Sequence, residues 1–435
     1  MKQILVRELK EYHLRELVGD VYSEDLYNEL YEKSTIIKKK LGLHVEPVSI
    51  FRRNGRRCIK FIGIAGILSL KSIEIEIMPK FYREDNCWRE NLFTMISLAE
   101  SGRIEAQRSK NMRYTSRNVY DHVGMLYVDE MEQALRKESI HSYRSIKESS
   151  RYLRGHILLS EELRSVVSHP GIICYERDVL EQENEFNYLL SWCVDYLLVH
   201  CKSKVVKRQL GAVKDRLPNV HGRYNIPVLS KLPPQYEHYA NAVKTANNVA
   251  LGASMQHSRG GGVGYGYIVA TEVIYEKFIE RILKSIKEHR KEFSSEAQTS
   301  VVFANSMHEK MPSYYTVPDN KIIINGEPGL LIDAKYKDNF KTGSRKKPIN
   351  SDVYQLFSSL VSHGCSKGIL LSPCDLDEDE SARYWSIDND GKQYIICSLC
   401  VNLRDISNKK AIDDFRNRLI ESIDDVLRLS TKKEG

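Results

Sequence analysis

Two acidic residues and a lysine fall at a spacing that could support hydrolysis of a phosphodiester. Asp319 stands before a predicted strand over residues 321–325, and Asp333 and Lys335 end the next one, over residues 330–336. A hairpin between these strands would bring Asp319 beside Asp333, and the offset of two puts Asp333 and Lys335 on one face. Two adjacent carboxylates favour a divalent cation such as Mg²⁺, and a lysine there could orient or deprotonate water.

The acid-x-lysine triplet carries meaning only through its surroundings. Glu8-Leu9-Lys10 and Asp390-Gly391-Lys392 satisfy the same pattern, and a solvated strand end with an ion pair is the ordinary interpretation of such a triplet. Asp333, however, follows the apolar run Leu330–Ile332, where a charge without a role is unfavourable, and Pro318-Asp319 lies one hairpin upstream. The context therefore favours a metal-dependent catalytic site.

The elements that would position these residues form a mixed α/β lobe over residues 267–425. Apolar periodicity predicts a helix over residues 267–287, and the order of predicted elements is α-β-β-β-α-β. The remaining core elements are strands at 299–303, 321–325, 330–336 and 367–371 and a helix at 352–363. Further strands are predicted at 383–387 and 393–401.

The rest of the chain divides by its patterns into other regions. Residues 1–95 are predicted to be β-rich, with a type I′ hairpin turn at Asn54-Gly55, and residues 96–257 are predicted to be mainly helical. The glycine-dense segment 258–266 is predicted to be a linker or loop, and residues 426–435 a C-terminal tail. The fold class is thus a multidomain α+β protein.

Composition excludes several classes of protein. The 435 residues correspond to about three typical domains, and 42% hydrophobic with 28% charged residues indicates a folded chain. No apolar stretch approaches the roughly 20 residues of a membrane span, and the N-terminus lacks the pattern of a signal peptide. We therefore expect a cytoplasmic protein without membrane contact. The net charge of +7 permits a polyanionic partner without requiring one.

Nine cysteines are too few for a disulfide scaffold in a chain of this length, and most are predicted to be small buried residues. Cysteine pairs of this kind can bind zinc, and the candidate ligands are Cys365, Cys374, Cys397 and Cys400. The offset of three between Cys397 and Cys400, however, points their side chains to opposite faces of a predicted strand. Buried thiols are therefore the preferred interpretation, with zinc as the lesser alternative.

These motifs resemble a known family. Pro318-Asp319, followed 14 residues later by Asp333-Ala334-Lys335, resembles the PD-(D/E)XK nuclease motif, and the α-β-β-β-α-β order resembles the core of that superfamily. More narrowly, residues 333–337 and the segment Asp352-Val353-Tyr354-Gln355-Leu356 are similar to the McrC family, the nuclease subunit of McrBC-type 5-methylcytosine-specific restriction systems. With further landmarks, the resemblance spans about residues 60–375.

The resemblance implies a Mg²⁺-dependent endonuclease. In such enzymes the two acids, here Asp319 and Asp333, bind the ion, and the lysine, here Lys335, assists the attacking water. Glu276 matches an acid on the preceding helix that often joins the site, with an exposed helix charge as the equally weighted alternative. Gln355 matches the first residue of a Gln-x-x-x-Tyr element whose tyrosine position holds a serine in this sequence.

The same resemblance implies two macromolecular partners. The substrate would be double-stranded, methylated DNA, and the second partner would be a McrB-like hexameric AAA+ GTPase that the chain stimulates. The chain lacks the Gly-Lys-Ser/Thr ending of a phosphate-binding loop and any evident base-reading module, so nucleotide hydrolysis and target choice would belong to others. The competing interpretation is a non-catalytic DNA-binding adaptor that activates a AAA+ motor.

Two basic stretches could contact these partners. A basic run after the cluster is well placed to hold DNA phosphates, although a solvated loop is the usual meaning of such a run. The run comprises Lys337, Lys341, Arg345, Lys346 and Lys347. The hairpin around Asn54-Gly55 could project into the pore of the GTPase, the alternative being an exposed basic hairpin without a partner. Its arginines are Arg52, Arg53, Arg56 and Arg57.

Overall fold

The structure is a computed structural model. It describes residues 2–82, 88–101, 119–161, 171–222, 224–226, 228, 230–254, 267–288, 290–308, 311, 313–336, 347–374 and 379–429. The chain forms two compact units, one made of Met1–His122 with Met255–Gly435 and the other of Val123–Ser254. The predicted segments 1–95 and 267–425 both lie in the first unit. In the described part of the chain, no helix has the length and apolar character needed to cross a membrane.

Two small sheets form the N-terminal part of the first unit. One has four strands in the order β1-β6-β5-β10, and the other has three in the order β2-β4-β3. β1 runs parallel to β6, whereas β5 pairs antiparallel with both β6 and β10. The strands are β1 Lys2–Arg7, β2 Glu11–His13, β3 Val48–Arg53, β4 Arg56–Phe61, β5 Ile64–Ser69, β6 Ile73–Met78 and β10 Tyr267–Ala270.

Strand β10 corrects the prediction of a single helix over residues 267–287. All four of its residues are buried and pair with β5, and helix α10 begins only at Thr271 and runs to Ser285. Gly66 of β5 permits this pairing, because a Cβ there would lie 1.9 Å from the carbonyl oxygen of Tyr267. A short apolar run fits either a helix or a strand, and pairing with a distant strand decided between them.

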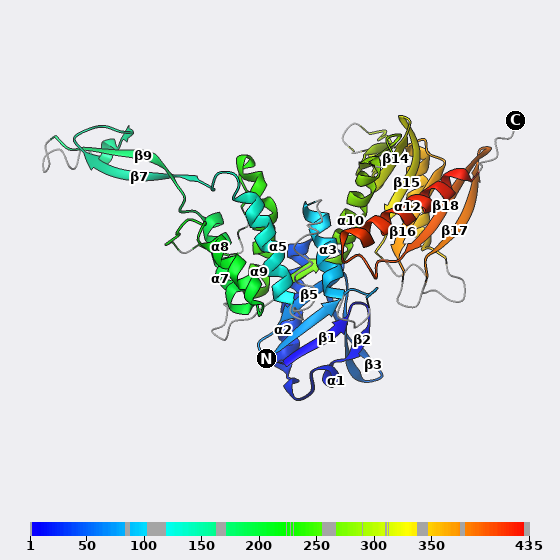
Figure 1. Ribbon diagram of the computed structural model, residues 1–435, viewed down its shortest axis with the longest axis horizontal. Coiled ribbons are helices and arrows are strands. Elements are labelled where there is room, and N and C mark those ends of the chain that lie inside the picture. Colours follow the sequence, from blue (N-terminus) through cyan, green and yellow to red (C-terminus); the bar gives the residue numbers. More distant parts are fainter. Residues whose placement is uncertain are drawn as a thin grey trace. The chain divides into compact units, whose positions relative to one another are not determined.

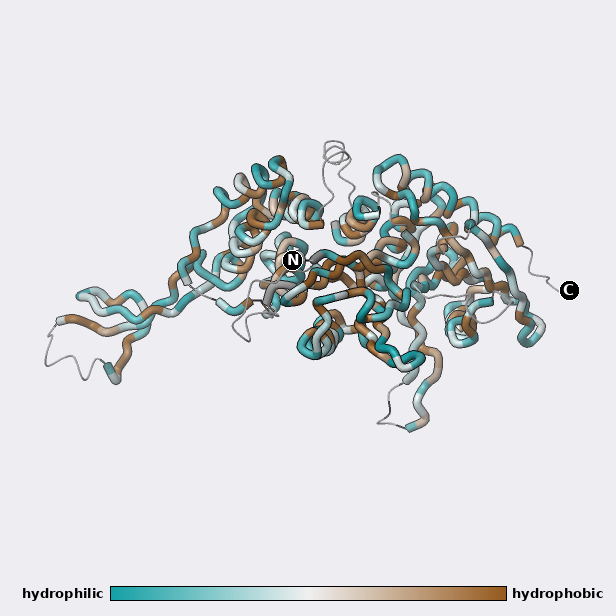
Figure 2. The backbone as a smooth tube through the Cα atoms, turned by 90° about the horizontal axis from the view of Figure 1, so that it is seen from below, coloured by the Kyte–Doolittle hydropathy of each residue, from teal (hydrophilic) through white to brown (hydrophobic). Residues whose placement is uncertain are grey.

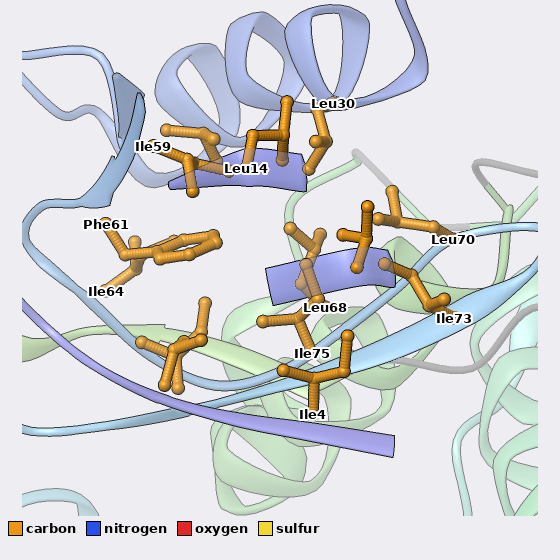
Figure 3. Packing of buried hydrophobic residues seen from close by; sticks show 14 of the residues in the cluster. Ile4, Leu14, Leu30, Ile59, Phe61, Ile64, Leu68, Leu70, Ile73 and Ile75 are labelled. Atoms are coloured by element: carbon orange, nitrogen blue, oxygen red, sulfur yellow. The ribbon is translucent and has the colours of Figure 1, made fainter. Parts of the chain in front are cut away.

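The hydrophobic core of the N-terminal part lies between these sheets and helix α2 (Glu24–Leu41), and Figure 3 shows Leu30 of this helix in the cluster. Ser23 caps the start of α2 by accepting a hydrogen bond from a backbone N–H, and Gly42 ends the helix with a left-handed φ of 65°. Full burial of an aliphatic side chain such as Leu30 contributes about 1.5–3 kcal/mol. The other helices of this part are α1 Leu14–Val18 and α3 Trp88–Ser101.

A six-stranded sheet in the order β11-β14-β15-β16-β18-β17 forms the C-terminal lobe of the first unit. β15, β16 and β18 run parallel, and the other neighbours pair antiparallel. Helix α11 (Asn350–Ser362) packs Leu356 and Leu360 into a cluster with Leu331 of β15. The strands are β11 Phe293–Ala297, β14 Asn320–Ile324, β15 Glu327–Ala334, β16 Lys367–Pro373, β17 Ser381–Asn389 and β18 Lys392–Val401.

The strands predicted for this lobe are confirmed except for the first. The predicted strand at 299–303 overlaps β12 (Val301–Ala304), which pairs with β13 (Tyr314–Thr316) in a separate two-stranded sheet. The first strand of the large sheet is instead β11, whose sequence FSSEA lacks the apolar alternation of a half-buried strand. β11 is an edge strand that buries only Phe293, so its sequence lacks the apolar pattern from which its pairing with β14 could be predicted.

Helix α12 (Lys409–Arg428) lies beside β16 and β18 in Figure 1, and Figure 2 shows it alternating between hydrophobic and hydrophilic residues toward the C-terminus. Phe415 of this helix contacts Phe278 of α10 with ring centroids 5.6 Å apart. The helix extends into the predicted tail 426–435. Its buried apolar residues are Ile412, Phe415, Leu419, Ile423 and Val426.

The second unit combines helices with a long antiparallel hairpin. Helices α5 and α7 fit the predicted helical character of residues 96–257, whereas β7 and β9 were not predicted, because β7 is largely polar and β9 lacks an alternating apolar face. Figure 1 shows this hairpin extending away from α7 and α8 of the same unit. The elements are α5 Val119–Ala134, β7 Ser142–Ser150, β8 His156–Ile157, β9 Ile173–Glu181, α7 Glu185–His200, α8 Lys204–Lys214 and α9 Ala240–Ser254.

Candidate active site

A two-residue turn brings the two predicted acids together. β14 and β15 are joined by residues 325 and 326, whose φ angles of 52° and 89° fit a type I′ turn. The register of the hairpin sets Asp319 opposite Asp333. The N–H of Ala334 donates to Oδ2 of Asp319 over 2.8 Å, which fixes that carboxylate beside the end of β15.

Asp333 is a buried acid at the end of β15. Its exposure is 3%, and the ammonium nitrogen of Lys335 lies 2.9 Å from its Oδ2. Against the effect of burial, the Asp333 carboxylate also raises the pKa of Lys335, so the two side chains form a buried ion pair. The N–H of Lys335 donates to the carbonyl oxygen of Leu371 on β16 over 2.7 Å. That bond holds the lysine backbone against the neighbouring strand.

Helix α10 contributes a third acid to the cluster. Burial, followed by the charges of Glu272 and Asp333, raises the pKa of the half-buried Glu276 to about 7, with Lys335 opposing the shift. Burial, then the charges of Asp333 and Glu276, raises the pKa of Asp319 to about 8. At neutral pH the cluster therefore holds protons on acids that are ionised in water.

Replacing Asp319 with asparagine should stabilise the protein in EDTA, and more so at high pH. The carboxyl of Asp319 has an ordinary pKa of 3.8 and a pKa of about 8 in the fold. Between these values the unfolded chain binds fewer protons, so stability falls as pH rises until the folded group has also lost its proton. The amide escapes this loss, and we expect its advantage to grow by about 1–2 kcal/mol between pH 5 and pH 8 after allowance for solvent screening.

Urea unfolding at pH 5 and pH 8 measures this advantage. Asp390→Asn alters an exposed carboxylate in the β17–β18 turn and is the matched control. An advantage of Asp319→Asn that is the same at both pH values would contradict the raised pKa of Asp319.

The carboxylates could hold a hard cation. Besides burial, the charge of Asp333 helps to raise the pKa of Asp319, because two adjacent carboxylates resist joint ionisation unless a cation lies between them. In the described ranges, no group of three or more His, Cys, Asp or Glu side chains is arranged to hold a metal ion by itself. An ion bound by Asp319 and Asp333 would therefore need water or substrate oxygens as further ligands, a mode that Mg²⁺ commonly uses.

Asp352 is an acid near the cluster to which the sequence assigned no role. It lies in the first turn of α11 with 3% exposure. Burial lowers the pKa of Lys335, but Asp333, Asp319 and Asp352 outweigh it, and the pKa is raised. The only sequence signal was the place of Asp352 in the segment that resembles the McrC family. Gln355, on the same helix, is exposed, and its role stays a prediction.

The predicted DNA-binding run falls largely outside the described residues. Lys347 is exposed just before α11. Lys337, Lys341, Arg345 and Lys346 lie outside the described part of the chain, as does the glycine-dense segment 258–266. The contribution of this run to DNA binding therefore stays a prediction.

The predicted docking hairpin forms from β3 and β4, with φ angles of 50° and 74° at Asn54 and Gly55. Three of its arginines pair with acids: Arg53 with Glu11 at 2.5 Å, Arg56 with Glu16 at 3.2 Å and Arg57 with Glu24 at 2.8 Å. The pairs of Arg53 and Arg56 are exposed and contribute at most about 1 kcal/mol each, so these two arginines can exchange partners, whereas Arg57 is half-buried and also contacts Tyr22 and Tyr27. A pocket of about 560 Å³ beside the hairpin is lined by His13, Arg15, Glu16, Tyr22, Arg52, Gly55, Arg56 and Arg57.

The described cysteines are free and buried, as predicted. Burial raises the pKa of Cys365 to about 11 and that of Cys397 to about 12, so both remain thiols at neutral pH. In β18, Cys397 and Cys400 stand in register with residues of β16. These side chains therefore contribute to the packing of the large sheet.

Comparison with known proteins identifies the class of protein. A sequence profile of restriction-system proteins matches residues 59–373, well over half of the chain. The chain belongs to the family that this profile describes, the McrBC 5-methylcytosine restriction system component. This match confirms the family that the motifs resemble. A search of curated proteins finds no significant match.

One of two similar solved structures shows the same fold. One chain, from a refined half-complex of the tetradecameric assembly of Thermococcus gammatolerans McrB AAA+ hexamers with bound McrC, has 16% identity and a TM-score of 0.58. The match covers 97% of this chain and 100% of that chain. Another, from the cryo-EM structure of the Thermococcus gammatolerans McrBC complex, has 16% identity, a TM-score of 0.43 and coverage of 65% and 87%. The first likeness shows a shared fold over nearly the whole chain.

Proposed function

We propose that this chain is the Mg²⁺-dependent endonuclease subunit of a modification-dependent restriction complex, with a PD-(D/E)XK nuclease as its C-terminal lobe. The observation that carries the proposal is the meeting of Asp319, Asp333 and Lys335 at the end of one hairpin. The element order α10-β11-β14-β15-α11-β16, apart from the inserted β12–β13 hairpin, supports the assignment.

Each residue of the cluster would have a separate role in hydrolysis. Asp319 and Asp333 would hold Mg²⁺, which when bound would offset negative charge on the phosphate and make water more acidic. The ammonium of Lys335 would orient the attacking water and offset charge on the scissile phosphate. Glu276, with a pKa of about 7, could accept a proton at its carboxylate near neutral pH. Gln355 joins this set on the resemblance alone.

A hexameric AAA+ GTPase would be the assembly partner. The structure with a TM-score of 0.58 is described as McrB AAA+ hexamers with bound McrC, and this chain matches the full length of its related chain. That likeness of fold supports a comparable assembly here, with the arginine hairpin as the proposed contact. The family is that of a 5-methylcytosine restriction system component, which supports methylated DNA as the substrate.

Replacing Arg345, Lys346 and Lys347 with alanine should weaken DNA binding by similar factors on unrelated sequences. Phosphate contacts carry no sequence information, and each lost contact should make the slope of log K against log salt shallower by up to about 0.9. Fluorescence anisotropy across a salt series measures this slope. The control replaces an equal number of exposed lysines near and beyond the C-terminal end of α10, Lys284, Lys287 and Lys291. If replacing Arg345, Lys346 and Lys347 leaves this slope unchanged, the three residues do not contact DNA phosphates.

A further inference from the structure

The carboxylate of Glu8 is a buried acid outside the proposed cleavage site. Glu8 directly follows β1 and is 1% exposed, and burial raises its pKa. A buried carboxylate is costly unless its oxygens receive hydrogen bonds. Both oxygens of Glu8 do receive them, from donors that come from three distant parts of the chain.

These donors connect the N-terminal sheet with the C-terminal lobe. Oε1 of Glu8 accepts from the N–H of Gly63 at 2.8 Å and from the hydroxyl of Thr271 at 2.9 Å. Oε2 accepts from the hydroxyl of Tyr336 at 2.6 Å. Gly63 directly precedes β5, Thr271 begins α10, and Tyr336 directly follows Lys335. The carboxylate of Glu8 is therefore hydrogen-bonded to the residue before β5, to the start of α10, which also carries Glu276, and to the residue after Lys335.

Tyr336 is held on several sides. The ring is 6% exposed, so it cannot leave its place without breaking its packing. Around it lie the rings of Phe81 and Tyr275, with centroids 5.8 Å away, and the Nζ of Lys80, 4.9 Å from the centroid of the Tyr336 ring. The hydroxyl of Tyr275 donates to the carbonyl of Leu371 at 3.2 Å, the oxygen that also accepts from the N–H of Lys335.

The backbone beside Glu8 also leads to the arginine hairpin. Leu9, in a left-handed conformation with φ of 63°, donates its N–H to the carbonyl oxygen of Phe61 at 2.8 Å. Phe61 is the last residue of β4, and Arg56, in the hairpin, is the first. A continuous path of hydrogen-bonded backbone and side chains thus runs from the hairpin through Glu8 to the segment of Lys335.

We propose that Glu8 is a positioning residue for the nuclease, which holds Tyr336 and thereby sets Lys335 relative to the acids of the cluster. The inference rests on the proposed nuclease function. It makes the alignment of the cleavage site depend on the N-terminal sheet, the part of the chain that carries the proposed contact with the GTPase. Small displacements at a catalytic group can cost about a hundredfold in rate, so a single hydrogen bond at this point has a measurable effect.

Two variants test the role of Glu8 while nearly preserving the volume of the buried side chains. Tyr336→Phe removes the hydroxyl and keeps the ring, and Glu8→Gln keeps the shape but replaces one acceptor with a donor. The matched control is Glu74 of β6, 7% exposed, whose Oε1 accepts from the hydroxyl of Tyr120 at 3.1 Å. Glu74→Gln and Tyr120→Phe alter a buried acid–tyrosine pair of comparable chemistry, with its acid on β6 of the same sheet and its tyrosine on α5.

The assembled complex with the AAA+ GTPase is the material for this test. We expect Tyr336→Phe to lower the cleavage rate constant about tenfold and Glu8→Gln ten- to a hundredfold, with a displaced pH–rate profile. Melting temperature and the stimulated GTP hydrolysis should stay near those of the wild type. Both control variants should cleave at the wild-type rate. Should Glu8→Gln not fold, Tyr336→Phe, which retains the packing, decides the result.

Two results would overturn the proposal for Glu8. One is a wild-type cleavage rate and pH profile in the folded variants, and the other is a parallel loss of cleavage and GTPase stimulation, which marks a merely structural role. Asp333→Asn, tested alongside, separates this proposal from the nuclease assignment. Full cleavage by Asp333→Asn refutes the nuclease itself, whereas an inactive Asp333→Asn beside a fully active Tyr336→Phe refutes only the role of Glu8.

Discussion

Asp333→Asn should reduce DNA cleavage by the assembled complex at least about a thousandfold, because in the proposed function Asp333 binds Mg²⁺, and loss of that ligand would remove several kcal/mol of transition-state stabilisation. Lys335→Ala should have a comparable effect, since it removes the cation that faces Asp333 at 2.9 Å. Asparagine has nearly the shape of aspartate, so the fold and the binding of the partner should be retained. Single-turnover cleavage of methylated DNA measures the loss, and circular dichroism checks the fold.

The matched control for this prediction lies in the same lobe. Asp390 and Lys392 repeat the acid-x-lysine spacing, but both are exposed at the β17–β18 turn. Asp390→Asn and Lys392→Ala should leave cleavage unchanged. Cleavage at the wild-type rate by Asp333→Asn would refute the nuclease assignment, and loss of cleavage in the control variants would show that the assay responds to charge alone.

The isolated chain should hydrolyse no nucleotide and should cut DNA on the order of a hundredfold more slowly than the complex, a ratio within the usual range of coupling between sites. Its sequence has no Gly-Lys-Ser/Thr phosphate-binding ending, so we expect the energy for movement along DNA to come from a partner. Both activities should appear when a hexameric AAA+ GTPase and GTP are added. Rapid, sequence-specific cutting by the isolated chain would contradict this dependence.

The arginine hairpin allows the contact with the partner to be tested separately. Alanine at Arg52, Arg53, Arg56 and Arg57 should reduce stimulation of GTP hydrolysis while leaving the acids of the cluster in place. Lys39 and Lys40, exposed on α2, provide control replacements in the same part of the unit. Full stimulation by the hairpin variant would refute only the assignment of the docking surface.

Local sequence was sufficient to predict the centre of the candidate site. An Asn-Gly turn between two apolar runs predicts the β14–β15 hairpin, and a register shift between Ile322 and Ile323 then pairs Asn320 with Ile332, so that Asp319 and Asp333 come next at the same end. Helices with strong apolar periodicity, such as α7 and α11, were predicted for the same reason. In these elements the interactions that decide the structure lie within a few residues of each other.

Elements that depend on distant pairing were not predictable. β10 forms because its four-residue apolar run pairs with β5, which lies about two hundred residues earlier in the chain. β11 and the β7–β9 hairpin were not predicted because their sequences lack the apolar alternation of a half-buried strand. The raised pKa values of Asp319 and Glu276 likewise depend on burial and on neighbours supplied by separate elements. Sequence patterns record local periodicity, whereas burial is a property of the packed chain.

Three of the acid-x-lysine triplets, those that begin with Glu8, Asp333 and Asp390, show what the sequence determines and what the tertiary structure decides. The sequence by itself determines that each places an acid two residues before a lysine. Packing buries Asp333 beside Asp319, leaves Asp390 exposed in a turn, and encloses Glu8 against Tyr336, which lies 328 residues further along the chain. A carboxylate acquires its chemistry from the charges, donors and solvent around it, and those come from residues that only the fold brings together.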